Sequence, residues 1–166
     1  MSERTVSELI ARPVSESVMP LLAETLAAEG LPTDDLTDAG NRFFEFRDGG
    51  GTLVGFAGLQ QFDSFALLRS IVVFPRARSQ ANGTSIVNWL AAEAVQHGAN
   101  ELFLLTTTAA DFFEKRGFRP VDRTEAPAAI ASTAEFTSLC PASAVLMRRA
   151  CAPREPRPPR TGSAGR

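Results

Sequence analysis

Apolar residues recur at helical spacing near the start of the chain. Ser15 is a suitable N-cap for a helix, and Gly30 ends the apolar pattern. A second, shorter helix is expected to begin at Thr33 or Asp34 and to end near Ala39. The residues that follow Ser15 at helical spacing are Val18, Leu21, Leu22, Thr25 and Leu26.

From Asn41 onward the pattern changes to the short apolar runs that are typical of strands. The segments Asn41–Arg47 and Thr52–Leu59 predict two strands, and Asp48–Gly51 between them has the Asp-Gly-Gly-Gly sequence of a hairpin turn. Phe65–Phe74 is the most continuous apolar run, which indicates a central strand buried on both faces. The remaining expected elements are a helix over 83–97, a strand over 101–107, a helix over 110–116, and strands over 118–121 and 143–148.

This order of elements predicts an α/β (α+β) fold in which one mixed sheet is covered by helices. Residues 65–107 form a strand–helix–strand unit, so its two strands should be parallel and its crossover right-handed. No internal repeat or linker is evident, and we assign residues 1–149 to one domain. Residues 150–166 are rich in proline and arginine and contain almost nothing apolar, so a disordered tail is expected there.

Composition and charge narrow the classes of function. Of the 166 residues, 44% are hydrophobic and 22% are charged, which suits a soluble domain with a core. The tail carries four arginines and one glutamate, which leaves 13 basic and 18 acidic residues in the body. An acidic body argues against a nucleic-acid-binding domain. No signal peptide, membrane span or disulfide framework is evident, so we expect a cytoplasmic protein.

The segment Ile71–Val87 has the pattern of a strand, a polar loop and the start of a helix. Amides of such a loop and of the first helical turn lack backbone partners, and the helix dipole adds positive potential, so the junction suits a phosphate. Arg78 would add a charged fork, and the small residues Ala81 and Gly83 would let an anion approach the backbone. Spacing alone leaves an ordinary strand-to-helix loop as the alternative.

The same segment resembles a motif of the GNAT superfamily of N-acetyltransferases. In that family, a strand ending in Val-x-Pro is followed by a pyrophosphate loop of the form Gln/Arg-x-x-Gly-x-Gly/Ala. Here Val73–Pro75 precedes the loop, Arg78 and Gly83 match its ends, and Ala81 stands where glycine is usual. A Cβ at position 81 requires that this residue avoid a positive φ.

A second stretch, Phe112–Phe118, resembles the family pattern Phe-Tyr-x-x-x-Gly-Phe. The resemblance covers roughly residues 1–149, and it implies a centrally splayed sheet of six to seven strands flanked by helices. It also implies acetyl-CoA as the co-substrate. The residues that it assigns to acetyl-CoA are Ile71, Val72, Val73, Arg78, Ser79, Gln80, Ala81, Asn82, Gly83, Thr84 and Phe113.

Three stretches resemble the small N-acetyltransferases of arsenic-resistance operons, which acetylate the arsenical glutamate analogue arsinothricin. They are Ala66–Val73, Leu104–Phe113 and Ala126–Met147. The Leu-Thr-Thr run within the second stretch also resembles the catalytic domain of N-acetylglutamate synthase. Both relatives act on the α-amine of an acidic amino acid or its analogue. The resemblance therefore implies acetyl-CoA-dependent N-acetylation of such a compound, with arsinothricin as the sharpest expectation and arsenic resistance as its role.

Two alternatives stay open. One is an amino-acid acetyltransferase of the N-acetylglutamate-synthase type, and the other is a non-catalytic domain that binds CoA or another ligand. In each case we expect a small-molecule partner, a monomer or homodimer, and no contact with nucleic acid or membrane.

The proton donor for the leaving thiolate is not assigned by sequence. Many relatives use the tyrosine of Phe-Tyr-x-x-x-Gly-Phe, but Phe113 occupies that place and the chain contains no tyrosine. Cys140 is a weak candidate donor, and a small buried hydrophobe is the alternative role for it. A backbone N–H near Val73 could hold the oxyanion. With a single histidine, His97, no metal site is expected.

Four polar residues are candidates for binding the acceptor. Arg69 is the only charge in the run 65–74, and strict alternation would place it on the face shared by Ile71 and Val73. It could bind an acidic group of the acceptor, or it could form a structural ion pair with an acidic residue such as Asp63 or Glu101. Ser70, Thr106 and Thr107 complete the set, because ligands favour the carboxyl ends of parallel strands.

Overall fold

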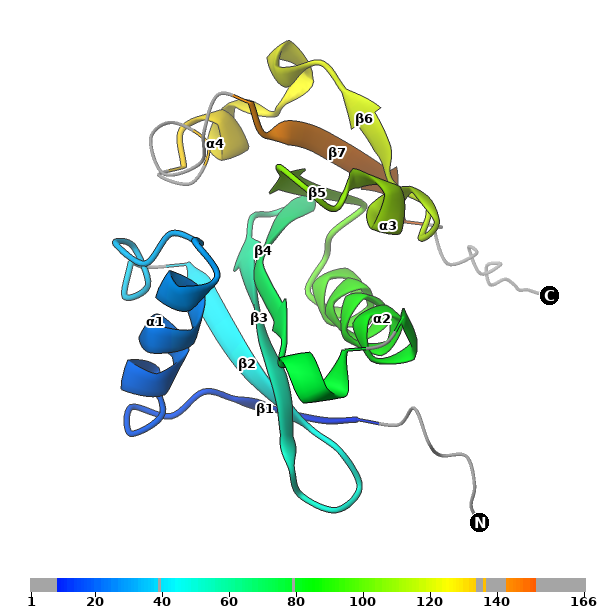
Figure 1. Ribbon diagram of the computed structural model, residues 1–166. Helices are drawn as coiled ribbons and strands as arrows, with labels where there is room; N and C mark the ends of the chain where they lie inside the picture. Colours follow the sequence, from blue (N-terminus) through cyan, green and yellow to red (C-terminus); the bar gives the residue numbers. More distant parts are fainter. Residues whose placement is uncertain (1–8, 39, 79, 134–135, 137–142, 152–166) are drawn as a thin grey trace, which may run out of the picture.

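A seven-stranded sheet frames the computed structural model, which describes residues 9–38, 40–78, 80–133, 136 and 143–151 (Figure 1). The strands lie in the order β1-β2-β3-β4-β5-β7-β6. They are β1 (Ile10–Pro13), β2 (Asn41–Arg47), β3 (Leu53–Gln61), β4 (Phe65–Val73), β5 (Glu101–Thr106), β6 (Arg119–Val121) and β7 (Val145–Ala150). The helices are α1 (Met19–Ala28), α2 (Gln80–Gln96), α3 (Ala110–Glu114) and α4 (Ala128–Ala131), with short 3₁₀ turns η2 (Pro75–Ala77) and η3 (Arg123–Glu125).

The sheet is mixed, as expected. Strands β4 and β5 are parallel and are joined through α2, whereas the other neighbouring strands pair antiparallel. The β4–β5 register begins at Phe65 opposite Glu101 and ends at Leu68 opposite Leu104. Both strands continue beyond that point, so the sheet splays at its centre.

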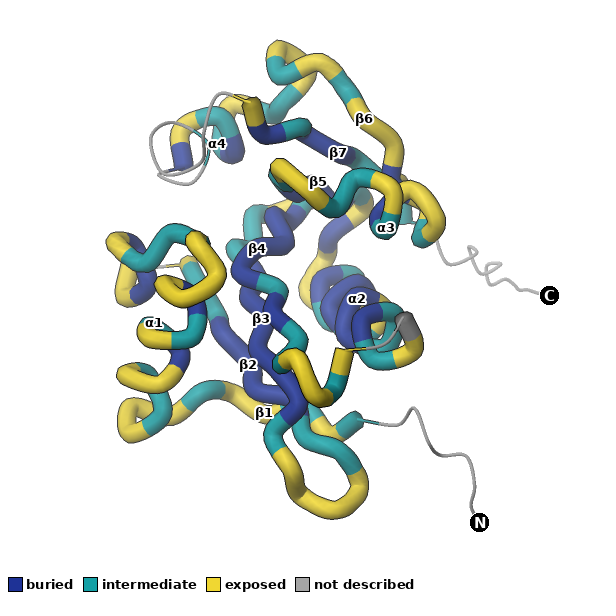
Figure 2. The backbone as a smooth tube through the Cα atoms, viewed as in Figure 1, coloured by how far each residue is buried: buried dark blue, intermediate teal, exposed yellow. Residues whose placement is uncertain are grey.

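Helices α1 and α2 cover opposite faces of the sheet (Figure 1). On the α2 face, Ile86 and Leu90 pack in one buried cluster with Leu59 and Leu68. On the α1 face, a second cluster combines leucines of the helix with Phe56. Figure 2 shows that buried residues follow β3, β4 and the inner side of α2. This two-sided cover explains why the sequence of β4 is almost continuously apolar.

The predicted hairpin is confirmed, and α2 ends within one residue of the end expected from the sequence. The carboxylate of Asp48 accepts hydrogen bonds from the amides of Gly50 and Thr52, at 2.9 and 3.0 Å, which closes the turn between β2 and β3. Gly98 follows α2 with a φ of +105°, a conformation that favours glycine at a helix C-terminus.

Three local predictions are wrong. Helix α1 begins at Met19 with Val18 as its N-cap, because the Ser15 carbonyl closes a preceding turn and the Ser15 hydroxyl hydrogen-bonds to Ser17. The segment expected to form a second helix folds into turns over residues 34–37, and Ala39 lies outside the described residues.

The third error concerns the end of the domain. Ala150, expected to open the tail, is the last residue of β7 and pairs with Glu101, and the amide of Cys151 donates to the Asn100 carbonyl at 2.8 Å. Residues 152–166, the rest of the expected tail, lie outside the described residues.

Candidate functional site

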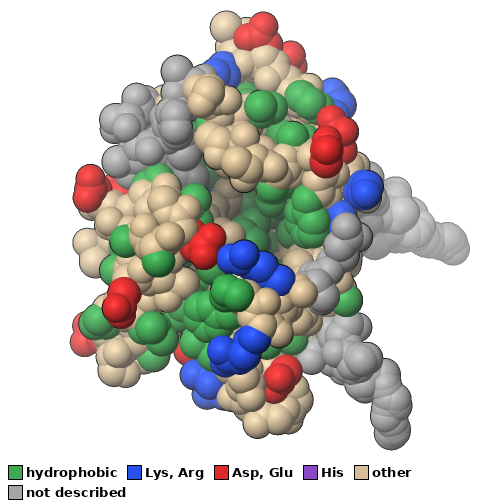
Figure 3. Space-filling model, in the orientation of Figure 1, with side chains coloured by type: hydrophobic (Ala, Val, Ile, Leu, Met, Phe, Trp, Pro, Cys, Tyr) green, Lys and Arg blue, Asp and Glu red, His purple; other side chains and the backbone are tan. Residues whose placement is uncertain are grey.

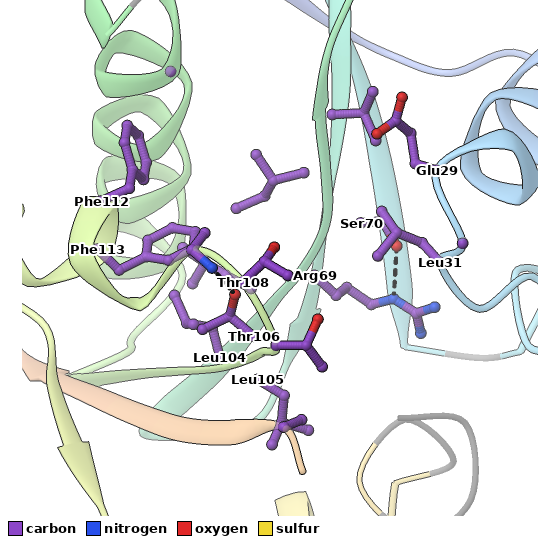
Figure 4. Close-up of a pocket in the computed structure, with 18 of the residues that line it drawn as sticks. Glu29, Leu31, Arg69, Ser70, Leu104, Leu105, Thr106, Thr108, Phe112 and Phe113 are labelled. Carbon is purple, nitrogen blue, oxygen red and sulfur yellow. Dashed lines mark hydrogen bonds between the residues drawn. The ribbon is translucent and has the colours of Figure 1, made fainter. Parts of the chain in front are cut away.

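A cavity of about 730 Å³ lies where β4 and β5 separate. Figure 3 shows it as a hollow lined by hydrophobic side chains, with acidic and basic side chains next to each other on its rim. Most of its wall comes from β4, the segment from β5 into α3, and residues 29–32 at the end of α1. Arg78 and Gly83 at the start of α2, and Ala144 before β7, complete it. In the close-up of Figure 4, Phe112 and Phe113 lie on the side of α2, and Glu29 and Leu31 lie across β4 from them.

A β-bulge shapes the β4 wall of the cavity. The register between β3 and β4 shifts between Phe56 and Gly58, and Ser70 has a φ of +59°, which non-glycine residues rarely adopt. Near this bulge the strands approach so closely that a Cβ on Gly55 would lie 2.1 Å from the Val72 carbonyl oxygen. Glycine at position 55 therefore allows the distorted pairing.

The bulge overturns the expected position of Arg69. Ile71 and Val73 pack against the α2-face cluster, whereas the Arg69 guanidinium lies 5.5 Å from the ring centroid of Phe43 on the α1 face. The extra residue in β4 shifts the alternation of side chains by one. Arg69 and Ile71 therefore lie on opposite faces, although they are two residues apart.

Arg69 forms a buried, bidentate ion pair with Asp35. Its two terminal nitrogens donate to the two Asp35 carboxylate oxygens at 2.5 and 2.8 Å, and the Arg69 side chain is fully buried. Arg69 therefore forms a structural ion pair, which was one of its two expected roles. Its partner is Asp35, and not Asp63 or Glu101. Asn41 adds to the network, because its side-chain amide donates to the Asp35 carbonyl at 2.9 Å.

Ser70 connects this ion pair to the cavity. Arg69 Nε donates to Ser70 Oγ at 3.1 Å, as Figure 4 shows, and both residues line the cavity. A serine oxygen that accepts one hydrogen bond keeps its own O–H as a donor. Ser70 can therefore offer a hydrogen-bond donor at this corner of the cavity, in a position that the Arg69–Asp35 pair fixes.

The expected anion site lies at the start of α2. The helix begins at Gln80, three residues earlier than predicted, so Ala81 and Asn82 belong to its first turn. Ala81 is not among the described residues with a positive φ, so its Cβ is compatible with the backbone. No acidic residue occurs in that first turn, which leaves the positive end of the helix dipole without a local counter-charge on the helix.

Arg78 stands just before this helix and lines the cavity. Its Nε donates to the Val73 carbonyl at 2.8 Å, which fixes the side chain to the end of β4. One terminal nitrogen lies 3.1 Å from the Glu29 carboxylate. Both side chains of this pair are partly exposed.

Gly83, the last residue of the loop motif, lies close to an aromatic ring. A Cβ on Gly83 would lie 2.9 Å from Cζ of Phe112. The Arg116 guanidinium stacks 3.8 Å from the centroid of the same ring and donates to the Thr84 hydroxyl at 2.6 and 2.9 Å. Thr84, expected to contact the cofactor, thus anchors α3 to α2, and Gly83 provides space for Phe112 as well as for a ligand.

The threonines at the end of β5 line the cavity, as expected. Thr106 Oγ1 accepts a hydrogen bond from the Ala109 amide at 3.0 Å, so this hydroxyl also supports the turn into α3. Thr107 is exposed. Phe113 is buried against Phe118 and forms part of the cavity wall.

Several candidates cannot be placed. Ser79, the side chain of Gln80, and Cys140 lie outside the described residues. Among the described residues the free cysteine is Cys151, whose thiol pKa is raised by burial and which does not line the cavity. The described ranges contain no cluster of three or more His, Cys, Asp or Glu suited to a metal, and no helix in them is long and apolar enough to cross a membrane.

Sequence reasoning missed two acidic residues of this region. Asp35 lies in a turn that was expected to be helical, 34 residues from its partner Arg69. Glu29 is the C-cap residue of α1, next to Gly30, which the sequence marks only as a helix end. Neither residue belongs to a motif, so no local signal identified them.

The mixed sheet is thus splayed around a cavity, and a polar strand-to-helix junction lies at one end of that cavity. The family model described as "Acetyltransferase (GNAT) family" matches residues 10–118. The chain therefore belongs to the GNAT acetyltransferase family, and the expected fold is confirmed.

Two known proteins with local similarity to this chain are amino-acid acetyltransferases. The chain is 37% identical over 73 residues to the amino-acid acetyltransferase of Escherichia fergusonii and 36% identical over 73 residues to that of Escherichia coli K12. Each match covers 43% of this chain and 16% of the relative, so the chain corresponds to a small part of those proteins.

Solved structures confirm the likeness of fold over a longer stretch. N-acetylglutamate synthase from Neisseria gonorrhoeae, complexed with coenzyme A and N-acetyl-glutamate, has a TM-score of 0.70 at 19% identity, over 86% of this chain and 35% of that one. Rv2747 from Mycobacterium tuberculosis, also in complex with CoA, has a TM-score of 0.70 at 19% identity, over 86% of this chain and 99% of that one.

Proposed function

We propose that this protein transfers an acetyl group from acetyl-CoA to the α-amine of a small acidic amino acid or analogue, and that arsinothricin is the acceptor. The observation that carries the proposal is the cavity at the splay of β4 and β5, which has an anion-suited helix start on one side and the Ser70 corner on the other. The matches to amino-acid acetyltransferases support an amino acid as the acceptor.

The start of α2 suits the pyrophosphate of acetyl-CoA. Amides in the first turn of a helix bind phosphates, and Arg78 and the side-chain-free Gly83 both line the cavity beside that turn. Acetyl-CoA would supply the acetyl group as a thioester. Phe113 and the residues of β4 beyond Leu68 would provide the apolar walls that exclude water around it.

The backbone of β4 after Leu68 is suited to stabilise the transfer of the acetyl group. Past this residue β4 no longer pairs with β5, so amides on that edge of β4 can face a ligand in the cavity. Preorganised backbone donors stabilise a developing oxyanion because they need no reorganisation during the reaction. Two reactants held together in such a cavity also gain from proximity.

The side of the cavity nearest α1 suits the acceptor. Ser70 offers a hydrogen-bond donor there, and an acidic group on the acceptor has oxygens that accept such a bond. The thiol of CoA has a pKa of about 8–9, like other alkyl thiols, so its thiolate can leave without a protein acid. A buried phenylalanine at position 113 is consistent with this chemistry.

Acetylation of glutamate itself is the second candidate, because the Leu-Thr-Thr run resembles N-acetylglutamate synthase and the local relatives are amino-acid acetyltransferases. Arsinothricin and glutamate differ in the acid group of the side chain, and the reaction, acetylation of the α-amine, is the same for both.

A thiol-release assay with a panel of acceptors tests the proposal. We expect acetyl-CoA-dependent release of CoA with arsinothricin, glutamate and phosphinothricin, with the highest kcat/KM for arsinothricin. Leucine serves as the control, because it has the same α-amine and a side chain without an acid group. A kcat/KM for leucine equal to those of the acidic acceptors would contradict the substrate class, and release without any added amine would indicate hydrolysis.

A further inference from the structure

A side-chain ion pair crosses the rim of the cavity. Glu29, at the C-terminal end of α1, pairs with Arg78, which precedes α2, at 3.1 Å. The two residues belong to opposite walls, since Glu29 lies on the same side as Leu31 and Ser70 in Figure 4, and Arg78 leads into the helix that suits the pyrophosphate.

The pair is weak enough to be exchanged. The Glu29 and Arg78 side chains are 39% and 52% exposed, so water screens their attraction, and pairs of this kind contribute little to stability. A pyrophosphate at the start of α2 would bring two phosphate groups close to Arg78. Arginine forms strong, charge-assisted hydrogen bonds with phosphate, so the anion would compete with Glu29 for the same guanidinium.

Release of Glu29 would leave a carboxylate on the acceptor side. Among the described residues that line the cavity, Glu29 is the only one with a carboxylate. The free α-amine of an amino acid is mostly an ammonium at neutral pH and needs an anionic partner when it enters a partly desolvated site. The two cationic lining residues, Arg69 and Arg78, cannot serve this purpose.

We propose that Glu29 is the residue that binds the acceptor's ammonium, and that it becomes available when the phosphates of acetyl-CoA draw Arg78 away. The inference rests on the proposed function, because it requires acetyl-CoA at the start of α2. Cofactor binding would then prepare the acceptor site.

The test compares Glu29→Gln with the wild type, first by calorimetry with CoA. We expect Glu29→Gln to bind CoA about two- to fivefold more tightly, the range for losing one exposed ion pair, because Arg78 is no longer shared. Glu24→Gln is the matched control, since Glu24 is an exposed carboxylate on the same helix, and it should leave CoA affinity unchanged.

A double-mutant cycle separates competition for Arg78 from general repulsion of the phosphates. In an Arg78→Gln background, Glu29→Gln should no longer change CoA affinity. The acceptor for the kinetic measurement is whichever of glutamate and arsinothricin the wild type acetylates faster. At saturating acetyl-CoA, Glu29→Gln should raise the KM for that acceptor by about tenfold or more.

Opposite effects on the two substrates would support the inference. It is overturned if Glu29→Gln leaves CoA affinity unchanged or weakens it, if tighter binding persists in the Arg78→Gln background, or if the acceptor KM does not change. A wild-type protein that does not bind CoA would contradict the proposed function as well, whereas failure of the variant effects alone leaves the proposed function standing.

Discussion

Replacing Asp35 with alanine is expected to lower the free energy of unfolding by about 3–5 kcal/mol, because it leaves the Arg69 guanidinium buried without its counter-charge. For a domain of this size, that loss corresponds to a fall in melting temperature of roughly 10 °C or more. Thermal denaturation followed by circular dichroism measures it. Asp34→Ala is the control, since Asp34 is exposed in the same turn, and its melting temperature should stay within about 2 °C of the wild type.

The kinetics of an Arg69 variant show whether the Arg69 guanidinium also binds the acceptor directly. Arg69→Lys keeps the charge but cannot match both carboxylate oxygens of Asp35. If Arg69 acts only through Asp35 and Ser70, the variant loses melting temperature, and its kcat/KM falls more for glutamate than for leucine, because Ser70 is the donor proposed for the acceptor's acid group. An increase in KM for glutamate alone, at an unchanged melting temperature, would contradict the structural role and assign Arg69 to the acceptor's acid group.

Gly83→Asp is expected to weaken CoA binding by roughly 100-fold or more, equivalent to about 2.7 kcal/mol. The new carboxylate would lie in the first turn of α2, where the amides and the dipole favour an anionic ligand. Calorimetry with CoA measures the change, and circular dichroism checks that the variant is folded.

The ring of Phe112 lies next to position 83, so the effect of the charge must be separated from the effect of added volume. Any Cβ at position 83 would lie 2.9 Å from Phe112, so Gly83→Asp combines a steric effect with a charge effect. Gly83→Ala adds the same Cβ without the carboxylate, and we expect it to lose no more than about tenfold in CoA affinity. Equal losses in both variants would mean that packing against Phe112, and not an anion site, explains the glycine.

Much of the frame of the site could be predicted from the sequence. The continuous apolar run of β4, the stripe on α2 and the strand–helix–strand order specify a buried parallel pair with a helix across it. The position of Arg78 and Gly83 at the start of that helix follows from the same pattern. These features depend on residues close in sequence, where periodicity and turn chemistry are informative.

The details of the acceptor side could not be predicted in the same way. The bulge depends on a positive φ at Ser70, and serine carries no signal for that conformation. Because the bulge shifts the alternation of side chains, the predicted face for Arg69 is wrong. The partner of Arg69, Asp35, lies in a turn outside the helices and strands. Glu29 reaches Arg78 across 49 residues of chain. Such contacts arise from tertiary packing, which a single sequence does not specify at the level of one residue.

A crystal structure of the protein with CoA tests the central claim most directly. We predict that the pyrophosphate lies on the amides at the start of α2 beside Arg78, that the thiol points into the gap where β4 and β5 separate after Leu68 and Leu104, and that the Glu29 carboxylate no longer contacts Arg78. CoA bound elsewhere on the sheet, or a pyrophosphate distant from α2 while the cavity between the two strands holds none of the molecule, would contradict the account.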